Sequence, residues 1–225
     1  HRSTTLALSG LRKAQQQTTS NSKTSMTTTI KTYPDNALKF RVDGGRVSYP
    51  RLNEPAQFQG EGKHRYSIDI VIDSEDAYNQ IAKLGKAAVI AAVGAAKGEK
   101  VYAELVAKNK VPYGSGDKKA GSAGYEGNWF ITAHTETAPT LLNNVAGEDG
   151  KPSVLKRPQS RIYSGCEANV VFSLYYQTKW SRLCASFSGV QFARDNEAFG
   201  GSAAATSDEF EAVEAAEAAD LDELG

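Results

Sequence analysis

Hydrophobic and polar residues alternate along several stretches of the chain, which is the pattern of β-strands that bury one face. The alternation over 38–52 is interrupted by Gly44-Gly45, which indicates a bent or paired strand. In 64–73 the positions expected on the buried face are Tyr66, Ile68, Ile70 and Ile72. Later stretches with strand-like composition are 128–136, 161–177 and 182–193. We therefore expect about five or six strands.

A single helix is predicted between the early and the late strands. Apolar residues recur every three or four positions from Ala77 to Ala96, which is helical spacing. The preceding Asp73-Ser74-Glu75-Asp76 could form a metal-binding cluster. An Asp or Ser N-cap followed by carboxylates in the first turn also complements the helix dipole, and we favour this capping interpretation.

The order of these elements suits a small barrel. We predict a mainly β fold: an OB-fold-like five-stranded Greek-key barrel with one inserted α-helix and a disordered acidic tail. The segment 112–127 is rich in glycine and serine and has Lys118 and Lys119 at its centre. It lacks the spacing of a phosphate-binding loop, so we predict a mobile loop and no nucleotide pocket.

The two ends of the chain differ from the body in composition. Residues 1–25 include four basic residues and no acidic residue, and the only methionine is Met26. We expect 1–25 to be a disordered leader foreign to the native chain, with a mitochondrial transit peptide as the alternative. We assign 26–206 to one OB-fold domain and 207–225 to a tail that is disordered in isolation.

Charge is distributed unevenly between body and tail. The chain has 26 basic and 26 acidic residues, and the tail holds eight of the acidic ones, which leaves 26 against 18, or a net +8, for residues 1–206. The acidic tail residues, with the one tail aromatic, are Asp208, Glu209, Phe210, Glu211, Glu214, Glu217, Asp220, Asp222 and Glu223. We predict that the tail competes for the anionic ligand of the body; the alternative is that it only keeps the protein soluble.

Several classes of protein are disfavoured. No apolar stretch approaches the roughly 20 residues of a membrane-spanning helix. Cys166 and Cys184 are too few for a disulfide framework or a four-cysteine zinc site, and we favour free thiols in a reducing compartment over a pair on adjacent strands. The histidines lack metal-binding spacing and no nucleophile motif is present, so we expect no enzyme and no cofactor. A nuclease that holds Mg²⁺ on Asp69 and Asp73 is a weaker alternative.

Aromatic residues are interleaved with basic residues at several places in the body. Single-stranded nucleic acid needs both, because bases stack on aromatic rings while Lys and Arg follow the phosphates. The pattern therefore predicts a groove that binds single strands with little reading of sequence. The candidate DNA-binding residues are Arg46, Tyr49, Arg51, Lys63, Arg65, Tyr113, Lys118, Lys119, Tyr125, Trp129, Arg161, Tyr163, Tyr175, Tyr176, Lys179, Trp180 and Arg182.

Some of the rings are expected in the core, because aromatic residues are also favoured in packed strands. The predicted core residues, in phase with the aliphatic positions, are Tyr66, Phe130, Phe172, Leu174, Phe187 and Phe192. The rings expected to be exposed or half-exposed are Tyr49, Tyr113, Tyr125, Trp129, Tyr163, Tyr175, Tyr176 and Trp180. A one-residue shift in the register of a strand would exchange the two sets.

Three groups of segments, in order along the chain, point to a known family. They are Gly124-Tyr125-Glu126-Gly127 before Trp129-Phe130-Ile131, then Ile162-Tyr163-Ser164-Gly165-Cys166, then Gly189-Val190-Gln191-Phe192-Ala193-Arg194-Asp195 with Phe199-Gly200. From Met26 onward the chain resembles the single-stranded-DNA-binding proteins of phage and prophage replication modules. The resemblance implies an OB-fold that protects single strands during phage DNA replication and recombination in the cytoplasm of the infected bacterial host.

The resemblance also implies partners for the tail. A DNA strand would displace the tail from the groove, and the tail would then recruit a polymerase, helicase or nuclease. Related tails often end on an aromatic residue that docks on partners, whereas this chain ends on Leu224-Gly225. The competing interpretation is a phage structural or assembly protein with an acidic interaction tail, which would bind no free single strands.

Overall fold

The computed structural model describes residues 27–58, 60–119 and 121–200. The predictions for 1–25 and for 207–225 lie outside the described residues. The strands are β1 (Thr29–Tyr33), β2 (Asn36–Phe58), β3 (Glu61–Ile72), β4 (Tyr113–Ser115), β5 (Trp129–Thr135), β6 (Thr140–Ala146), β7 (Pro152–Val154), β8 (Glu167–Gln177) and β9 (Arg182–Arg194). The helices are α1 (Glu75–Val93) and α2 (Ala95–Ala107), with short 3₁₀ helices η1 (Gly116–Lys119) and η2 (Thr178–Trp180).

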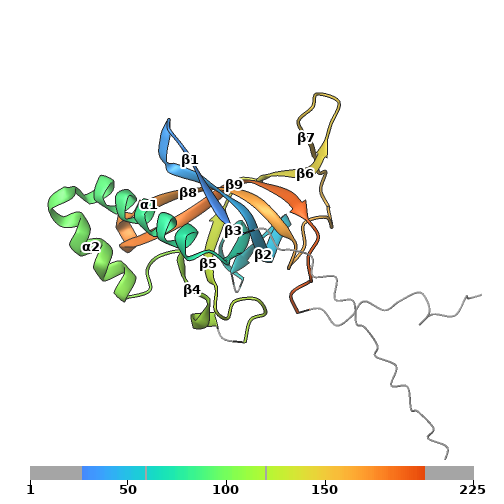
Figure 1. Cartoon of the computed structure of the whole chain (residues 1–225). Helices are drawn as coiled ribbons and strands as arrows, with labels where there is room; N and C mark the ends of the chain where they lie inside the picture. Colours follow the sequence, from blue (N-terminus) through green and yellow to red (C-terminus); the bar gives the residue numbers. More distant parts are fainter. Residues whose placement is uncertain (1–26, 59, 120, 201–225) are drawn as a thin grey trace, which may run out of the picture.

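All of these strands belong to one sheet. Its order is β4-β5-β3-β2-β8-β9-β6-β7, and β1 pairs with β2. Neighbouring strands are antiparallel except for β6 and β9, which are parallel. In Figure 1, α1 and α2 lie together at one end of the sheet, and the β6–β7 hairpin projects at the other. β5 also approaches β9, although the hydrogen-bonded order of the described strands ends at β4 and β7.

The mainly β class is confirmed, but the predicted strand number is wrong. The described residues form nine strands, not five or six. The additional strands are β1, β4 and the β6–β7 hairpin. β1, β4 and β7 are only three to five residues long, which is too short for alternation to be recognised in the sequence, and β6 buries only Leu141.

The predicted single helix is also wrong, because two helices form. Gly94, with a φ of 88°, ends α1 and precedes α2 directly. The next positions are mainly alanine, lysine and glycine, which hide the helical pattern in the sequence. Only Leu105 is a fully buried large residue of α2, whose apolar side packs on α1. Neither α1 nor α2, the helices of the described residues, is long and apolar enough to cross a membrane.

The predicted bend in the first strand is confirmed. β2 is one long strand that pairs with β8 over 39–46 and with β3 over 46–58. The register with β8 shifts between Val42 and Gly45. A Cβ at Gly45 would collide with the Ile70 side chain, so glycine lets β2 approach β3 closely at the bend.

The predicted start of the first helix is confirmed, and the predicted buried face before it is confirmed for its three isoleucines but not for Tyr66, which is partly buried. Ile68, Ile70 and Ile72 of β3 are fully buried. Ser74 is the N-cap of α1, and its hydroxyl accepts a hydrogen bond from the Ala77 N–H at 3.2 Å. Glu75 and Asp76 occupy the first turn, where their charge complements the helix dipole.

The core is formed by side chains of the strands, of α1 and of α2. Phe40 and Phe172 stack at its centre with ring centroids 5.6 Å apart. Phe172, Leu174, Phe187 and Phe192 are buried as predicted, whereas Tyr66 and Phe130 are only partly buried. Cys166 is buried, Cys184 is half-buried and both thiols are free, which confirms the expectation of unpaired cysteines.

Candidate nucleic-acid interface

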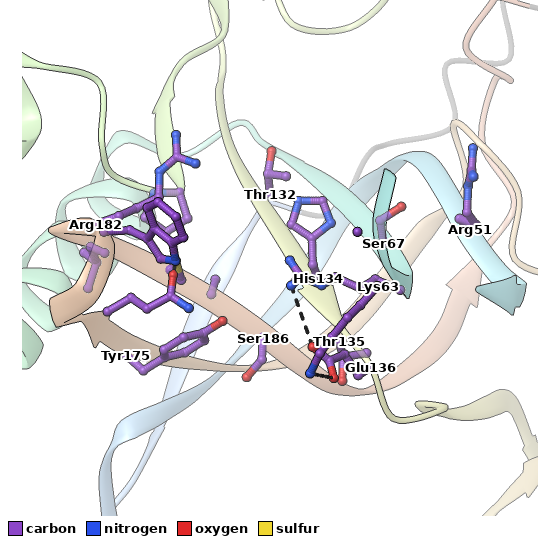
Figure 2. Close-up of a pocket in the computed structure, with 18 of the residues that line it drawn as sticks. Arg51, Lys63, Ser67, Thr132, His134, Thr135, Glu136, Tyr175, Arg182 and Ser186 are labelled. Atoms are coloured by element: carbon purple, nitrogen blue, oxygen red, sulfur yellow. Dashed lines mark hydrogen bonds and ion pairs between the residues drawn. The ribbon is translucent and has the colours of Figure 1, made fainter. Parts of the chain in front are cut away.

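A groove of about 1040 Å³ runs over one face of the sheet. Its walls come from β2, β3, β5, β8 and β9 and from the segment before β4. Figure 2 shows Arg51 at one side of this groove and Arg182 at the other, with Thr132 and His134 of β5 between them. The volume is at the upper end of the range for small-molecule pockets, roughly 300–1,000 Å³, which suits an extended ligand better than a compact one.

The groove is positively charged. Arg51, Lys63, Arg65 and Arg182 line it, and Glu136 is the one carboxylate among the described residues of its walls. Lys63 Nζ lies 2.7 Å and the Arg65 guanidinium 3.7 Å from the Glu136 carboxylate. Within the part of the chain that the structure describes, Arg51 and Arg182 make no ion pair. These two guanidinium groups are therefore available to an anionic ligand.

Histidine adds little charge to the groove. Desolvation lowers the pKa of His134, and the neighbouring Arg65 and Arg182 lower it further, although Asp69 acts in the opposite direction. Its imidazole is consequently neutral at pH 7. The attraction for phosphate therefore comes from the arginine and lysine side chains.

Aromatic rings line the groove beside these cations. Tyr49 is 62% exposed, Tyr175 is 43% exposed and Trp180 is 63% exposed, and Phe130 contributes a partly buried ring. Tyr49 has a φ of 45°, and Ser181, directly after Trp180, has a φ of 44°. Left-handed backbone is uncommon outside glycine and often occurs at functional positions. The groove thus offers stacking surfaces at both of its sides.

A second hollow of about 390 Å³ adjoins the groove beyond Trp180. It shares Gln177, Trp180 and Arg182 with the groove and adds Lys110. The Lys110 carbonyl accepts a hydrogen bond from the Leu183 N–H at 3.0 Å, which fixes the chain before β4 against β9. The cationic surface therefore continues past the indole ring.

Seven of the predicted DNA-binding residues come together in this groove. They are Tyr49, Arg51, Lys63, Arg65, Tyr175, Trp180 and Arg182. Lys179 lies beside them, with its Nζ 5.2 Å from the Trp180 ring centroid. The β-sheet therefore gathers residues that are up to 133 positions apart in the sequence, from Tyr49 to Arg182.

Two rings that were predicted to be exposed are buried. Tyr113 is 4% exposed, and its hydroxyl lies 3.0 Å from the Tyr102 hydroxyl. Tyr125 is fully buried, and its hydroxyl donates to Asp69 at 2.8 Å. Burial raises the pKa of both phenols. They are buried because each hydroxyl has a partner inside the protein, and neither ring is accessible to a base.

The segment predicted as a mobile glycine loop contains structure. It forms β4 and η1, and Tyr125 anchors its later part in the core. Lys118 points to Asn109, with Nζ 2.7 Å from the amide oxygen. Lys119 is drawn inward to Asp69 at 2.5 Å. Neither lysine lines the groove.

Other predicted residues lie away from the groove. Trp129 stacks on Tyr78 of α1 with centroids 5.8 Å apart, and Tyr176 is partly buried against the core. Arg161 pairs with Asp195 at 3.3 Å, and the Tyr163 hydroxyl lies 2.9 Å from the Asn196 carbonyl. These side chains hold the fold together at sites that the groove does not reach.

The chain after β9 forms a strap, residues 195–200, against the middle of β2 at Arg46. Arg46 donates to the Gly165 carbonyl at 3.1 Å and to the Glu197 carbonyl, and its guanidinium lies 4.0 Å from the centroid of the Phe199 ring. A Cβ at Gly124 would collide with that same ring. The three groups of segments that carry the family resemblance thus meet at the strap.

Several groove residues on β5 are missed by the sequence-based prediction. Phe130, Thr132 and His134 line the groove, while Ile131 and Ala133 are buried behind them. The alternation of residues over 130–134 indicates that Phe130, Thr132 and His134 share one face of β5. This signal is hidden because Phe130, a large apolar residue, is expected on the core face, which shifts the expected register by one. Other polar residues missed in the groove are Gln57, Ser67, Thr135, Glu136, Gln177 and Ser186.

The weaker nuclease alternative is not supported by the position of Asp69. The residue is 7% exposed, and its carboxylate is held by Lys119 and Tyr125. Asp73 instead accepts a hydrogen bond from the Thr28 N–H at 2.8 Å. The described residues contain no group of three His, Cys, Asp or Glu side chains that could hold a metal ion.

Comparison with known proteins gives a consistent set of relatives. The curated "Putative protein p50" of Acyrthosiphon pisum secondary endosymbiont phage 1 is 30% identical over 192 residues, which cover 82% of this chain and 98% of that protein. The single-stranded DNA-binding protein of bacteriophage Enc34, solved in complex with ssDNA, is 26% identical with a TM-score of 0.56, over 73% of this chain and 90% of that one. A C-terminal truncation of the Enc34 protein is 25% identical with a TM-score of 0.52, over 72% of this chain and 89% of that one.

A family model matches most of the chain. It is the model described as "Enterobacter phage Enc34, ssDNA-binding protein", and it matches residues 39–222, which include all of β3 to β9 and most of the acidic segment 207–225. The chain therefore belongs to the family of phage single-stranded-DNA-binding proteins represented by the Enc34 protein.

Proposed function

We propose that this protein binds single-stranded DNA in the groove between Arg51 and Arg182, without sequence specificity, during phage DNA replication and recombination in the host cytoplasm. The observation that carries the proposal is the combination of four cations and four aromatic rings around one groove. The Enc34 protein, which was solved with ssDNA, supports it. Membership of a DNA-binding family also agrees with the prediction that the chain is not an enzyme.

The groove offers the two kinds of contact that a single strand needs, namely rings for base stacking and cations for the phosphates. Tyr49, Phe130, Tyr175 and Trp180 can each receive a base, and a stacked base contributes about 1–3 kcal/mol in any sequence. Arg51 and Arg182 can pair with phosphates, which makes the affinity fall as salt rises. Serine and threonine hydroxyls can follow the sugars and phosphates without reading base edges. Duplex DNA buries its base faces and cannot use the rings.

We further propose that β5 and β9 bring the sheet into an OB-like barrel that forms the back of the groove. The body extends over 26–206 in this proposal, and the acidic segment 207–225 competes with DNA for the same cations. DNA displaces this acidic segment because base stacking adds binding free energy that the carboxylates of the segment cannot supply. The displaced segment then recruits replication proteins such as a polymerase, helicase or nuclease.

Fluorescence anisotropy with a labelled oligo-dT tests the binding proposal. We expect binding to the single strand that exceeds binding to the matching duplex and weakens with salt. The double variant Arg51→Met/Arg182→Met should bind more weakly and with a shallower salt dependence, by about 0.7 per lost phosphate contact. The matched control is Lys97→Met/Lys100→Met, which removes two exposed charges from α2 outside the groove.

The outcomes separate the parts of the proposal. Equal losses in the two double variants would show that only net charge matters and would refute the groove. Absence of binding in the full chain and in a chain that ends at Thr206 would refute DNA binding altogether. If the shortened chain binds no more tightly than the full chain at low salt, the competition proposed for 207–225 is refuted while the groove remains.

A further inference from the structure

The Lys119 side chain is 29% exposed, but its ammonium points toward the buried Asp69 and Tyr125 and away from the open part of the groove, which it does not line. Its Nζ is 2.5 Å from Asp69 Oδ2 and 3.4 Å from Thr132 Oγ1. The same Nζ lies 4.0 Å from the centroid of the Phe130 ring and 5.0 Å from that of the Tyr125 ring. An ammonium group has three donors, and two of them are directed at Asp69 and Thr132.

Asp69 explains why the lysine is held there. The residue is 7% exposed, and a buried carboxylate is costly unless it is paired and hydrogen-bonded. Asp69 accepts hydrogen bonds from Lys119 and from the Tyr125 hydroxyl at 2.8 Å. If Lys119 turned outward to a phosphate, this carboxylate would lose its cation and keep the neutral Tyr125 donor.

The pair is in contact with the rings of the groove. Tyr125 and Phe130 have centroids 5.8 Å apart, and Tyr49 and Tyr125 have centroids 6.5 Å apart. Tyr49 and Phe130 line the groove, whereas Tyr125 lies buried between them. The three rings therefore form a continuous row, and the ammonium of Lys119 lies close to two of its members.

We propose that Lys119 is a positioning residue for DNA binding: paired with Asp69, it fixes the Phe130 and Tyr125 rings as a rigid stacking platform and makes no phosphate contact. The proposal rests on the DNA-binding function proposed above and reverses the role that the sequence suggests for this lysine. A ring that is already fixed loses little conformational entropy when a base stacks on it. A cation near a ring face also holds that ring in one orientation.

The test uses the salt dependence of oligo-dT binding, because it distinguishes a positioning cation from a phosphate contact. The variant Lys119→Met/Asp69→Asn removes both charges and leaves an acceptor for the Tyr125 hydroxyl. We expect its affinity to fall about threefold to tenfold, with an unchanged slope of log K against log salt. Arg51→Met is the reference for a phosphate contact, and its slope should fall by about 0.7.

A double-mutant cycle with Phe130→Leu completes the test. If Lys119 acts through the ring, Lys119→Met/Asp69→Asn should weaken binding while Phe130 is present and have little further effect when it is combined with Phe130→Leu. Lys118→Met is the matched control, because Lys118 lies next in sequence but contacts Asn109. Thermal unfolding verifies that each variant is folded under the binding conditions.

The outcomes are distinct. A slope that falls in Lys119→Met/Asp69→Asn as it does in Arg51→Met, or an unchanged loss in the Phe130→Leu background, would overturn the positioning role. An unchanged affinity would overturn it as well. Failure of the unmodified protein to bind oligo-dT would instead refute the proposed function, so the two failures are distinguishable.

Discussion

We expect Glu136 to limit the affinity of the groove for DNA, so that its replacement strengthens binding. The carboxylate lies 2.7 Å from Lys63 Nζ and 3.7 Å from the Arg65 guanidinium. Its pKa is lowered, foremost by the hydrogen bond from Lys63, so the carboxylate stays ionised at neutral pH. A DNA phosphate must compete with it for both cations. Glu136→Gln removes the charge while keeping the size of the side chain.

The size of the effect follows from the number of cations released. Each additional phosphate contact with a single strand steepens the slope of log K against log salt by about 0.7. If the lines for the two proteins meet near 1 M salt, one new contact raises the affinity about fivefold at 0.1 M, and two contacts raise it about 25-fold. We expect a gain between these values, constant from about pH 6 to 8 because Glu136 is ionised throughout that range.

The assay is anisotropy of labelled oligo-dT at several salt concentrations. Glu148→Gln, in the exposed turn between β6 and β7, is the matched control and should change nothing. A Glu136→Gln protein with the affinity and slope of the unmodified protein would show that no phosphate reaches Lys63 or Arg65. In that case only Arg51 and Arg182 would contact the DNA phosphates.

Three further predictions concern stacking and the fold. Trp180→Ala should weaken oligo-dT binding by about 1–3 kcal/mol with an unchanged salt slope, and an altered slope would argue against a stacking role. Tyr125→Phe loses the hydrogen bond to Asp69, so denaturant unfolding should show a loss of about 1 kcal/mol; an unchanged midpoint would contradict the observed bond. Gly124→Ala places a Cβ against the Phe199 ring at a φ of 81°, so we expect a loss of about 1–3 kcal/mol in the same assay, whereas Ala123→Gly should cost far less.

The strands with long, regular alternation could be predicted from the sequence, and so could the first helix. In β3 the groove residues Lys63, Arg65 and Ser67 and the buried isoleucines occupy alternating sets of positions, so the pattern is clear without tertiary information. The start of α1 is equally clear, because the Ser74 cap is a local interaction. The short strands and α2 depend on packing partners that are distant in sequence, and their local patterns are weak.

The groove residues were only partly predictable for a related reason. Pairing of rings with cations identified Tyr49, Arg51, Tyr175 and Arg182, which come together in the groove. The same pairing could not distinguish these residues from Tyr125, which is buried and whose hydroxyl donates a hydrogen bond to Asp69 of β3. Composition shows which residues can bind DNA, but burial depends on long-range partners that the local sequence does not specify.

The placement of the two tryptophans has a practical consequence. Trp180 is exposed at the side of the groove, whereas Trp129 is stacked on Tyr78 on the other side of β5. Indole emission depends on its surroundings, so the two residues act as a reporter and an internal reference within one chain. A strand that stacks on Trp180 would quench one part of the emission and leave the part from Trp129 unchanged. Binding could therefore be followed with unlabelled DNA and unlabelled protein.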